Sequence, residues 1–377
     1  MNIAIVHDWF TEKGGAENVV SELLDLFPEA EFFSLVDFFD TEQRRQVLRD
    51  KHVTTTFIQR LPFAKKIFRH YLLLFPLAIE RLDLRKFDLI ISSSYAVSKG
   101  VMSGPSQLHI SYCHSPMRYA WDMYFPYIEE HKVTGIKEKF LSYVLHKIRV
   151  WDVVASNRVD HFIANSDFVR KRIGKYYRRD APVIHPPVDT DRFSLHEAKE
   201  AYYFTVSRMV PYKKIRMIAE AFAANGRPLV IAGDGPEFDA ISRIATPNIT
   251  LLGYVSDAVV TEYMQKAKAF VFAAYEDFGI VPVEAMACGT PVIAYGKGGI
   301  LDTMVDGTTG VLFDEQTAAS LNRAVERFET LPYDARRISE HARRFSSERF
   351  REEISAFIDE KLADFNLQNG RGNSTSV

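Results

Sequence analysis

Cysteine is scarce in this chain of 377 residues: only Cys113 and Cys288 occur, far apart in the sequence. Two cysteines make no disulfide framework, and their number suits a protein of the reducing cytosol. Long apolar runs are lacking as well. The longest candidate, HYLLLFPLAIERL, is interrupted by Pro76 and Glu80, so we find no run of the roughly 18 residues that a membrane span needs.

We expect no signal peptide, and the chain carries no strong net charge. The first residues, MNIAIVHDWF, carry no charged segment before an apolar run that has the length of a strand. The net charge of -2 gives no reason to expect nucleic acid as the main partner. The hydrophobic share of 47% and the charged share of 25% are those of an ordinary folded soluble protein, and the length predicts two domains.

Short apolar runs alternate with longer helical patterns along the whole chain. In the first half the runs are NIAIVHD, EFFSLVD, FDLIISSS, HISYCHS, HFIANS and APVIHPPV. In the second half they are YYFTVSR, RPLVIAGDG, NITLLGYV, AFVFAA, TPVIAYG and GVLF. Such runs predict strands buried on both faces of parallel sheets, with helices as crossovers. Two series predict two doubly wound α/β domains, with a ligand between them at the carboxyl ends of the strands.

The domain boundary is expected at HPPVDTDRFSLHEAKEAYYF, where Pro186 and Pro187 end one sheet. We therefore predict an N-terminal domain over residues 1–190 and a C-terminal domain over residues 191–345. The polar tail, residues 367–377, is expected to be disordered. The Asp-x-Asp of VDTD falls in the connection between domains, which argues against a metal site there.

Glycines and cations follow the predicted strands where a phosphate would bind. Gly14 and Gly15 come after the first strand, just where a helix begins, and free N–H groups there favour an anion or serve a simple turn. Arg208 follows the first strand of the second half, with Lys213 and Lys214 close behind. Cations normally avoid a helix start, so a bound phosphate explains them, although a solvated basic turn is the alternative.

The stretch YEDFGIVPVEAMACGTPVIAYGKGG holds Glu276 and Glu284 around a predicted helix start. The N–H groups of Phe278, Gly279 and Ile280 offer an anion cradle there, and the two carboxylates suit sugar hydroxyls. A glycosidase pair would not need this basic and amide-rich setting. Metal binding lacks a nearby third ligand, and helix capping explains either glutamate only singly. The turn IAGDGPEFD has Phe238 at the third glycine position of a dinucleotide fingerprint, so we interpret it as a tight turn that a nucleotide approaches.

Together these motifs resemble the nucleotide-binding domain of the large retaining glycosyltransferase family of GT-B fold that carries a Glu-x7-Glu motif (glycosyltransferase family 4-like). The matching pieces are SRMVPYKK, AGDGPE, GYVSD, the long stretch from Tyr275 to Gly299, and DGTTGVLF, over roughly residues 203–313. GGAE and ANSDFVRKRI match more loosely. The resemblance implies two Rossmann-like domains facing across a cleft. It also implies that a C-terminal helix, about residues 346–366, crosses back to complete the first domain.

The resemblance also implies roles for single residues. Arg208 and Lys213 would hold the donor diphosphate, and Glu284 the nucleotide ribose. Glu276 would hold the donor sugar with the amides of residues 278–280, while Gly14 and Gly15 would lie close to the donor phosphates and the acceptor. His114, in SYCHSPMRYAWD, matches a family histidine beside the donor sugar, although a lone histidine is often a packed one.

Two positions depart from the family pattern. Lys214 stands where glycine commonly follows the phosphate lysine, and Asp302 stands where the family usually has glutamate. The resemblance implies transfer with retention and without a required metal or other cofactor. Because no nucleophile can be identified, we favour a front-face route in which the departing phosphate helps to deprotonate the acceptor hydroxyl.

Two basic and apolar segments suggest the acceptor and the location. They are FIQRLPFAKKIFRHYLLLFPLAIERLDLRK and KVTGIKEKFLSYVLHKIRVW, which would suit either an anionic membrane surface or core helices with solvated basic faces. We expect peripheral contact with the cytoplasmic face of the inner membrane and a lipid-linked oligosaccharide acceptor. SYCHSPMRYAWD resembles the bacterial mannosyltransferases of O-antigen, capsule and exopolysaccharide, so GDP-mannose is the expected donor.

The alternatives remain open at this stage. A UDP-sugar-dependent glycosyltransferase of the same fold is the main one, and a nucleotide-sugar 2-epimerase shares the architecture. An oxidoreductase that uses nicotinamide is disfavoured by Phe238 and by the cations at 208 and 213. A binding protein without catalysis is the last alternative.

Overall fold

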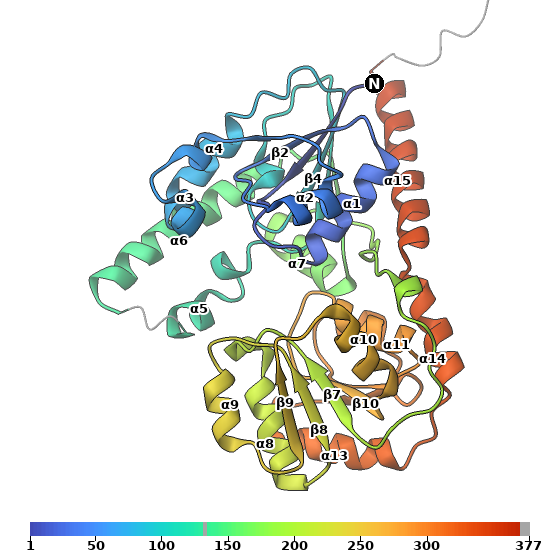
Figure 1. The fold of residues 1–377 in the computed structure, drawn as a ribbon. Helices are drawn as coiled ribbons and strands as arrows, with labels where there is room; N and C mark the ends of the chain where they lie inside the picture. Colours follow the sequence, from blue (N-terminus) through green and yellow to red (C-terminus); the bar gives the residue numbers. More distant parts are fainter. Residues whose placement is uncertain (131–133, 370–377) are drawn as a thin grey trace, which may run out of the picture. The chain divides into compact units, whose positions relative to one another are not determined.

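The structure is a computed structural model, and it describes residues 1–130 and 134–369. These residues form two compact units. The first unit comprises Met1–Pro186 together with the chain from Phe350 onward, and the second comprises Pro187–Arg349. Each unit is a six-stranded sheet covered by helices (Figure 1). The predicted fold class, two doubly wound α/β domains, is therefore confirmed.

The first unit has the strand order β3-β2-β1-β4-β5-β6, and all its paired strands are parallel. Its strands are β1 (Ile3–His7), β2 (Glu31–Ser34), β3 (Val53–Thr55), β4 (Leu89–Ser94), β5 (Leu108–Cys113) and β6 (His161–Ala164). Its helices are α1 (Gly15–Leu26), α2 (Thr41–Leu48), α3 (Ala64–Ile67), α4 (Phe75–Glu80), α5 (Tyr124–Glu130), α6 (Ile136–Ser156), α7 (Asp167–Tyr177) and α15 (Ser347–Gln368). Short 3-10 helices cover Phe57–Arg60, Phe68–Leu74, Ser98–Gly100 and Arg118–Ala120.

Successive residues of the first sheet enter opposite cores. Ile5 packs with α1, α2 and α15, while Ala4 and Val6 pack with α4, α6 and the 3-10 helices near Phe68. This alternation is what a strand buried on both faces requires. The sheet thereby holds its backbone rigidly and presents the carboxyl ends of β1, β4 and β5 side by side.

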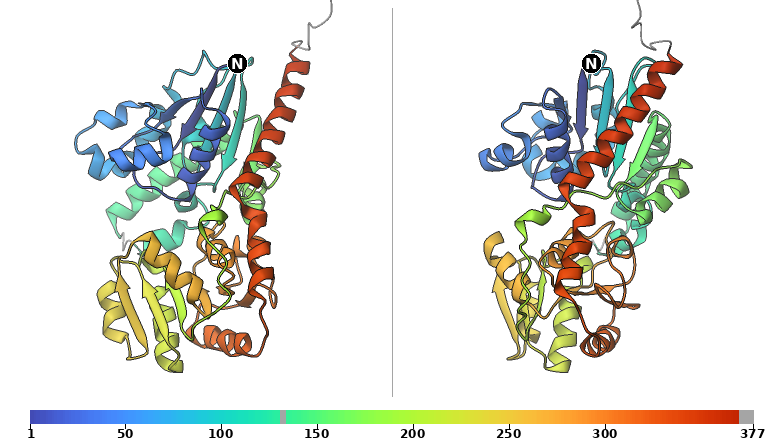
Figure 2. Two further views of the ribbon diagram at one scale, coloured as in Figure 1. Left: turned by 45° about the vertical axis from the view of Figure 1, so that its right-hand side comes forward. Right: turned by 90° about the vertical axis from the view of Figure 1, so that its right-hand side faces the viewer.

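The helix α15 completes the first unit, far in sequence from the rest of it. Phe350, Ile354 and Ile358 are buried in the core that also contains α1. Figure 2 shows α15 running beside the first sheet in both views. The predicted first residue of the disordered tail, residue 367, is too early, because Leu367 still belongs to α15. The predicted disorder of residues 370–377 lies outside the described residues.

The second unit has the strand order β12-β11-β10-β7-β8-β9, again all parallel. Its strands are β7 (Tyr203–Val206), β8 (Leu229–Ala232), β9 (Ile249–Gly253), β10 (Ala269–Phe272), β11 (Val292–Tyr295) and β12 (Gly310–Phe313). Its helices are α8 (Ile215–Asn225), α9 (Phe238–Ile244), α10 (Asp257–Lys266), α11 (Ile280–Ala287), α12 (Ile300–Thr303), α13 (Ala318–Glu329) and α14 (Ala335–Ala342). Its 3-10 helices are Thr190–Arg192, Pro211–Lys213 and Arg343–Phe345.

One predicted strand is wrong and one strand was not predicted. The run APVIHPPV makes only isolated bridges, from Val183 to Ala164 and from Val188 to Ser346. Pro182, Pro186 and Pro187 lack the N–H groups that a strand interior needs. The missed strand is β3, an edge strand of three residues.

Candidate functional site

Two sets of polar residues lie at the carboxyl ends of the strands, one set in each unit. In the second unit the set follows β7 and β10. Arg208 lies in the loop after β7, is exposed, and makes no side-chain hydrogen bond or ion pair with the described residues. A guanidinium left without a protein partner at this edge is available to an anionic ligand.

The glycines of AGDG support the loop that carries Arg208. A Cβ atom at Gly233 would lie 2.0 Å from the carbonyl oxygen of Ser207, and one at Gly235 would lie 2.7 Å from that of Met209. Both glycines have positive φ, and Met209 donates its N–H to the carbonyl of Asp234 at 2.8 Å. The two glycines therefore let this turn pack directly against the Ser207–Met209 loop, and the approach of a nucleotide to the turn stays a prediction.

Lys213 and Glu276 form an ion pair, so the structure brings together two of the predicted site residues. Each side chain is 22% exposed, which leaves the pair within reach of a ligand. Lys213 ends the 3-10 helix Pro211–Lys213, and Lys214 follows with φ of 59° before α8. That left-handed conformation explains why glycine would be favoured at position 214. Of the two lysines it is Lys213 that pairs with Glu276, and its role toward a phosphate stays a prediction.

The loop that carries Glu276 rests on Gly298 and Gly299. A Cβ atom at Gly298 would lie 2.4 Å from the carbonyl oxygen of Glu276, and one at Gly299 would lie 2.1 Å from that of Asp277. Gly299 also donates its N–H to the Glu276 carbonyl at 2.9 Å. The two glycines therefore let the chain after β11 pack directly under this loop and fix its backbone.

The helix α11 begins beside Glu276. Gly279 precedes it with φ of 93°, and within the described part of the chain neither Gly279 nor Ile280 donates its backbone N–H to a protein acceptor. Pro282 lacks an N–H and so loses nothing near the helix start. Two amides of the predicted cradle, those of Gly279 and Ile280, therefore lie open at the start of α11, where the partial positive charge of the helix also favours an anion. The part of Phe278 in that cradle stays a prediction.

Glu284 lies one turn further along α11. It is half-buried and makes no side-chain hydrogen bond or ion pair in residues 1–130 and 134–369. Burial raises the pKa of Glu284 to about 7; Arg192 opposes this rise, and the carboxylates of Asp257 and Asp189 add to it. A partly buried carboxylate without a protein partner is costly unless a ligand satisfies it, so Glu284 has the properties of a ligand-binding carboxylate.

In the first unit, Asp8 organises the loop that follows β4. Its buried carboxylate accepts the N–H groups of four successive residues, from Tyr95 to Ser98, at 2.6 to 2.8 Å. Such charge-assisted hydrogen bonds are among the strongest in proteins. The loop is therefore fixed next to the ends of β1 and β5.

His114 is connected to the start of α1 through a row of buried side chains. Its Nε2 lies 2.8 Å from Oγ of Ser93, which lies 3.1 Å from Nδ1 of His7. Nε2 of His7 lies 3.1 Å from Oε1 of Glu17. Burial, aided by the positive field of His7, lowers the pKa of His114 to about 3, so His114 is neutral at physiological pH.

Gly14 stands directly against this row. It adopts an extended conformation before α1, which begins at Gly15, and its carbonyl accepts the N–H of Asn18. A Cβ atom at position 14 would lie 3.1 Å from Oε2 of Glu17. The predicted residues Gly14, Gly15 and His114 thus belong to one end of the first sheet.

Sequence reasoning missed His7, Ser93, Glu17 and Asp8. The signal was present, since polar residues end the otherwise apolar strands β1 and β4. Their joint meaning depends on the strand order, because His7 and Ser93 are cross-strand neighbours only when β4 pairs with β1.

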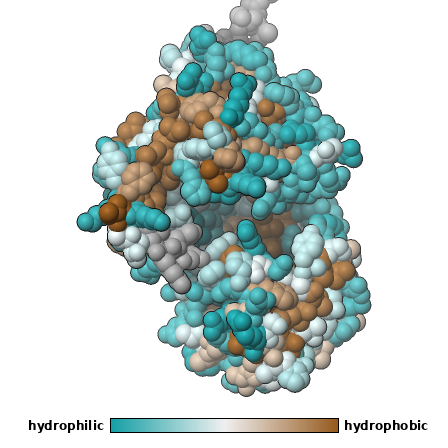
Figure 3. All heavy atoms as spheres, turned by 60° about the vertical axis from the view of Figure 1, so that its left-hand side comes forward, coloured by the Kyte–Doolittle hydropathy of each residue, from teal (hydrophilic) through white to brown (hydrophobic). Residues whose placement is uncertain are grey.

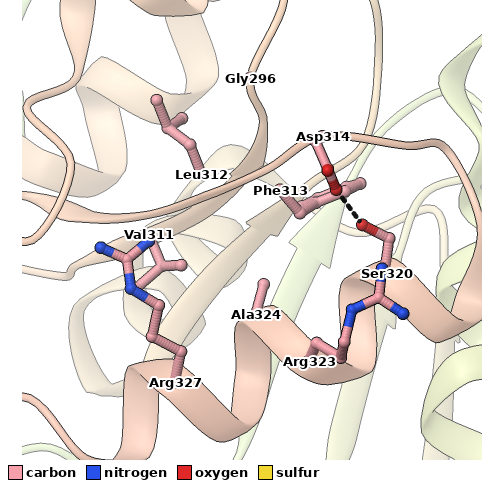
Figure 4. A pocket seen from close by; sticks show the side chains of 9 residues that line it. All are labelled: Gly296, Val311, Leu312, Phe313, Asp314, Ser320, Arg323, Ala324 and Arg327. Carbon is pink, nitrogen blue, oxygen red and sulfur yellow. Dashed lines mark hydrogen bonds between the residues drawn. The ribbon is translucent and has the colours of Figure 1, made fainter.

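A separate pocket of about 400 Å³ lies between β12 and α13 (Figure 4). Arg323 and Arg327 reach it from α13, and Ser320 donates a hydrogen bond to Asp314 at 2.7 Å. Arg327 is paired with Asp306 at 2.8 Å. None of the predicted site residues lines this pocket, and we assign it no role.

Two features are absent from the described ranges, residues 1–130 and 134–369. No group of three or more His, Cys, Asp or Glu side chains there is placed to hold a metal ion, so the expected independence from metal stays a prediction. No described helix combines the length and the apolar character that crossing a membrane demands.

The sequence of this chain is similar to those of known glycosyltransferases. Residues 188–345 match the family described as Glycosyl transferases group 1, and residues 13–192 match Glycosyltransferase Family 4. A D-inositol 3-phosphate glycosyltransferase of Mycobacterium leprae is 28% identical over 241 residues, which are 55% of this chain and 56% of that protein.

Two further comparisons concern a mannosyltransferase and a solved structure. A GDP-mannose-dependent alpha-(1-6)-phosphatidylinositol monomannoside mannosyltransferase of Mycolicibacterium smegmatis is 31% identical over 196 residues, 42% of this chain and 50% of that protein. The chain therefore spans about half the length of these curated relatives. The crystal structure of Anabaena HepE in complex with UDP matches with a TM-score of 0.68 and 18% identity, covering 96% of this chain and 100% of the other.

Proposed function

Because the chain belongs to the GT-B glycosyltransferases, matched by two family models that together run from residue 13 to residue 345, we propose that it is a retaining glycosyltransferase. In this proposal it transfers mannose from GDP-mannose to a lipid-linked glycan during bacterial surface polysaccharide synthesis. The observation that carries the proposal is the Lys213–Glu276 ion pair beside the open amides of α11 and the unpaired Arg208.

In this proposal the second unit binds the sugar-nucleotide donor. Arg208 and Lys213 bind the diphosphate and offset the negative charge that develops on it as the sugar leaves. The N–H groups of Gly279 and Ile280 point the positive ends of their dipoles at the same diphosphate. Because these groups already supply positive charge, the reaction requires no metal ion.

The Lys213–Glu276 pair has a second use in this scheme. Before the donor binds, each charge neutralises the other, so neither is left half-buried and unpaired. When the donor binds, Lys213 turns to the phosphate and Glu276 accepts hydroxyl groups of the sugar. Glu284 accepts the hydroxyl groups of the ribose, which satisfies its unpartnered carboxylate.

The chemical step is a front-face displacement. The bond between the anomeric carbon and the diphosphate oxygen breaks, and the acceptor oxygen attacks from the same face. The departing phosphate takes the proton of the acceptor hydroxyl. The protein contributes positioning and charge stabilisation, with His114 beside the sugar.

The mannose assignment is supported by the Mycolicibacterium relative, whose name states its use of GDP-mannose. The HepE complex shows that a protein of this fold binds UDP, which keeps a UDP-sugar donor as the second candidate. A nucleotide-sugar 2-epimerase is less well supported, because both matched families are glycosyltransferases.

In this proposal the first unit binds the acceptor. Arg69 stacks over Trp9 with its guanidinium carbon 5.7 Å from the ring centre, and Trp9 meets Tyr95 edge-on at 5.0 Å. The Tyr95 ring lies 6.1 Å from that of His114. This aromatic row, from His114 to a cation, suits a sugar ring that carries a phosphate further along, as a lipid-linked glycan does.

The same unit carries a surface suited to an anionic membrane. Exposed apolar and basic side chains alternate over α3, α4, α6 and the 3-10 helix Phe68–Leu74 (Figure 3). The exposed apolar members include Phe63, Leu73, Leu74, Leu77, Phe140, Val150 and Val154. We propose that this surface, here named the α3–α6 face, holds the enzyme at the cytoplasmic side of the inner membrane.

The first experiment is thermal stabilisation by GDP, GDP-mannose, UDP, UDP-glucose and NAD, each with and without EDTA. A ligand that binds only the folded state raises the melting temperature. Stabilisation by GDP and GDP-mannose that survives EDTA supports the proposal. Stabilisation by UDP ligands alone replaces the donor, and stabilisation by NAD alone refutes the function.

Variants of the two glutamates then test the site assignment. Glu284→Ala is expected mainly to weaken donor binding, whereas Glu276→Ala lowers turnover more. Transfer of radiolabelled mannose to lipid-linked acceptor in vesicles with and without anionic lipid measures both turnover and the membrane requirement. Negligible effects of both variants would refute the assignment.

A further inference from the structure

Four buried side chains form one continuous row in the first unit: Glu17, His7, Ser93 and His114. We propose that this row, named the Glu17–His114 relay, determines which nitrogen of His114 carries its proton. It thereby sets what His114 offers to the donor sugar, and it makes Ser93, His7 and Glu17 positioning residues of the transfer reaction. This inference rests on the proposed function for its meaning, although the relay itself can be tested without any substrate.

The direction of each hydrogen bond in the row follows from Glu17, the carboxylate at one end. An ionised carboxylate only accepts, so Nε2 of His7 must carry a proton to contact Glu17 at 3.1 Å. When His7 is neutral, its Nδ1 has no proton, and the hydroxyl of Ser93 donates to it. The oxygen of Ser93 can then only accept from His114, so Nε2 of His114 carries the proton. Nδ1 of His114, which makes no hydrogen bond with the described residues, is left as an acceptor.

The row reverses when one proton is added. A proton that binds Nδ1 of His114 lets the proton on Nε2 pass to Oγ of Ser93. The original hydroxyl proton of Ser93 then passes to Nδ1 of His7. Three bonds to hydrogen form and two break, and the added positive charge comes to rest on His7. His114 is neutral before and after, but its Nδ1 has changed from an acceptor to a donor.

The surroundings of the two rings favour the added positive charge on His7 over His114. His114 is costly to protonate where it lies, since burial lowers its pKa to about 3. His7 instead faces Glu17 from α1, while Ser93 and the Tyr95 ring face it from β4 and the loop after β4. Asp8, next to it on the chain, is already saturated by four backbone N–H groups. Glu17 is therefore the counter-charge, and its other oxygen would lie 3.1 Å from a Cβ atom at position 14, so a larger residue there would displace the Glu17 carboxylate.

The test is nuclear magnetic resonance of the full chain labelled with nitrogen-15 in its histidines. The nitrogen shifts report which ring nitrogen is protonated, and a His114→Gln spectrum identifies the His114 signals. In the unaltered protein, Nδ1 of His114 is expected to carry a proton only when both ring nitrogens of His7 are protonated. A His114 that shows the same tautomer with His7 neutral and with His7 charged would overturn the proposal.

Two matched serines of β4 supply the control. Ser93→Ala removes the bridge, so the tautomer of His114 should no longer follow the charge of His7. Ser92→Ala removes a similar buried serine–histidine bond, from Ser92 to His109 at 2.9 Å, without touching the relay. It should leave the coupling intact, and loss of coupling in both variants would overturn the proposal.

Glu17→Gln preserves the shape of the side chain and so guards against a variant that fails to fold. Without the negative charge, a charged His7 is less stable, and the change at His114 should move to lower pH. An unchanged pH would overturn the role of Glu17.

Activity gives the final readout. Ser93→Ala should lower kcat about tenfold and flatten the acid side of its pH profile, whereas Ser92→Ala should do neither. Equal profiles for both variants would overturn the role in transfer. If the unaltered protein transfers no sugar while the spectra show the coupling, the proposed function is refuted and the relay stands.

Discussion

Replacing Glu284 by glutamine should make the folded protein more stable at alkaline pH. The carboxyl group is half-buried in α11, and its burial raises its pKa from 4.5 to about 7. The unfolded chain loses this proton near pH 4.5 and the folded chain near pH 7. Between these values the folded state binds more protons, so its stability falls as the pH rises and stays low above pH 7.

The size of the effect follows from the shift. The difference between 7 and 4.5 is about 2.5 pKa units, and each unit corresponds to roughly 1.36 kcal/mol, which gives an upper value of about 3.4 kcal/mol. Because the side chain keeps part of its contact with water, we expect about half of this. Glu284→Gln keeps the shape and cannot ionise. It should raise the melting temperature at pH 8 by roughly 3 to 6 °C.

Thermal and urea unfolding at pH 5 and pH 8 measure this difference. Glu340→Gln on α14 is the matched control, since Glu340 is exposed and makes no ion pair with the described residues. A gain at pH 8 that shrinks at pH 5 supports the reasoning, while a loss at pH 8 or an equal gain at both pH values would refute it. The same variant should bind the nucleotide about tenfold more weakly, because its amide replaces an anionic acceptor.

Three other substitutions test the local arguments. Gly299→Ala should destabilise the fold by at least about 2 kcal/mol in urea unfolding, since its Cβ would lie 2.1 Å from a backbone oxygen, whereas Gly104→Ala, with only a 3.5 Å contact, should be nearly neutral. Asp8→Asn should cost about 3 kcal/mol in the same assay, because an NH2 group would face N–H donors; an unchanged midpoint would contradict this. Burial lowers the pKa of Lys199 from 10.5 to about 8. Between these two pH values the folded state binds fewer protons than the unfolded state, so the stability of the fold rises with pH there. Lys199→Met should abolish this rise, measured as urea midpoints from pH 8 to pH 10.

Much of the fold could be predicted from the sequence because its strands are buried on both faces. All six predicted strands of the second half are found, and their continuous apolar runs leave little ambiguity. The failures have local causes. Edge strand β3 spans only Val53–Thr55, too short and polar for an apolar run, and the run around Val183 contains prolines that pattern alone does not penalise enough.

The site was predictable where the chemistry lies within one motif. Glu276, Gly279 and Glu284 could be placed around a helix start because their spacing carries that information. The pairing of Glu276 with Lys213 could not, since 63 residues separate them. His7 and Ser93 looked like ordinary strand ends, and only the register between β1 and β4 shows that they meet.

The return of the chain to the first unit at Phe350 has a consequence for synthesis. The core around α1 includes Phe350, Ile354 and Ile358, which leave the ribosome after the whole second unit. Until they emerge, one face of the first sheet stays incomplete, while the second unit can already fold as a continuous segment. The domain that begins first therefore finishes last, and an interrupted chain that ends before residue 350 would expose an apolar face to chaperones and proteases.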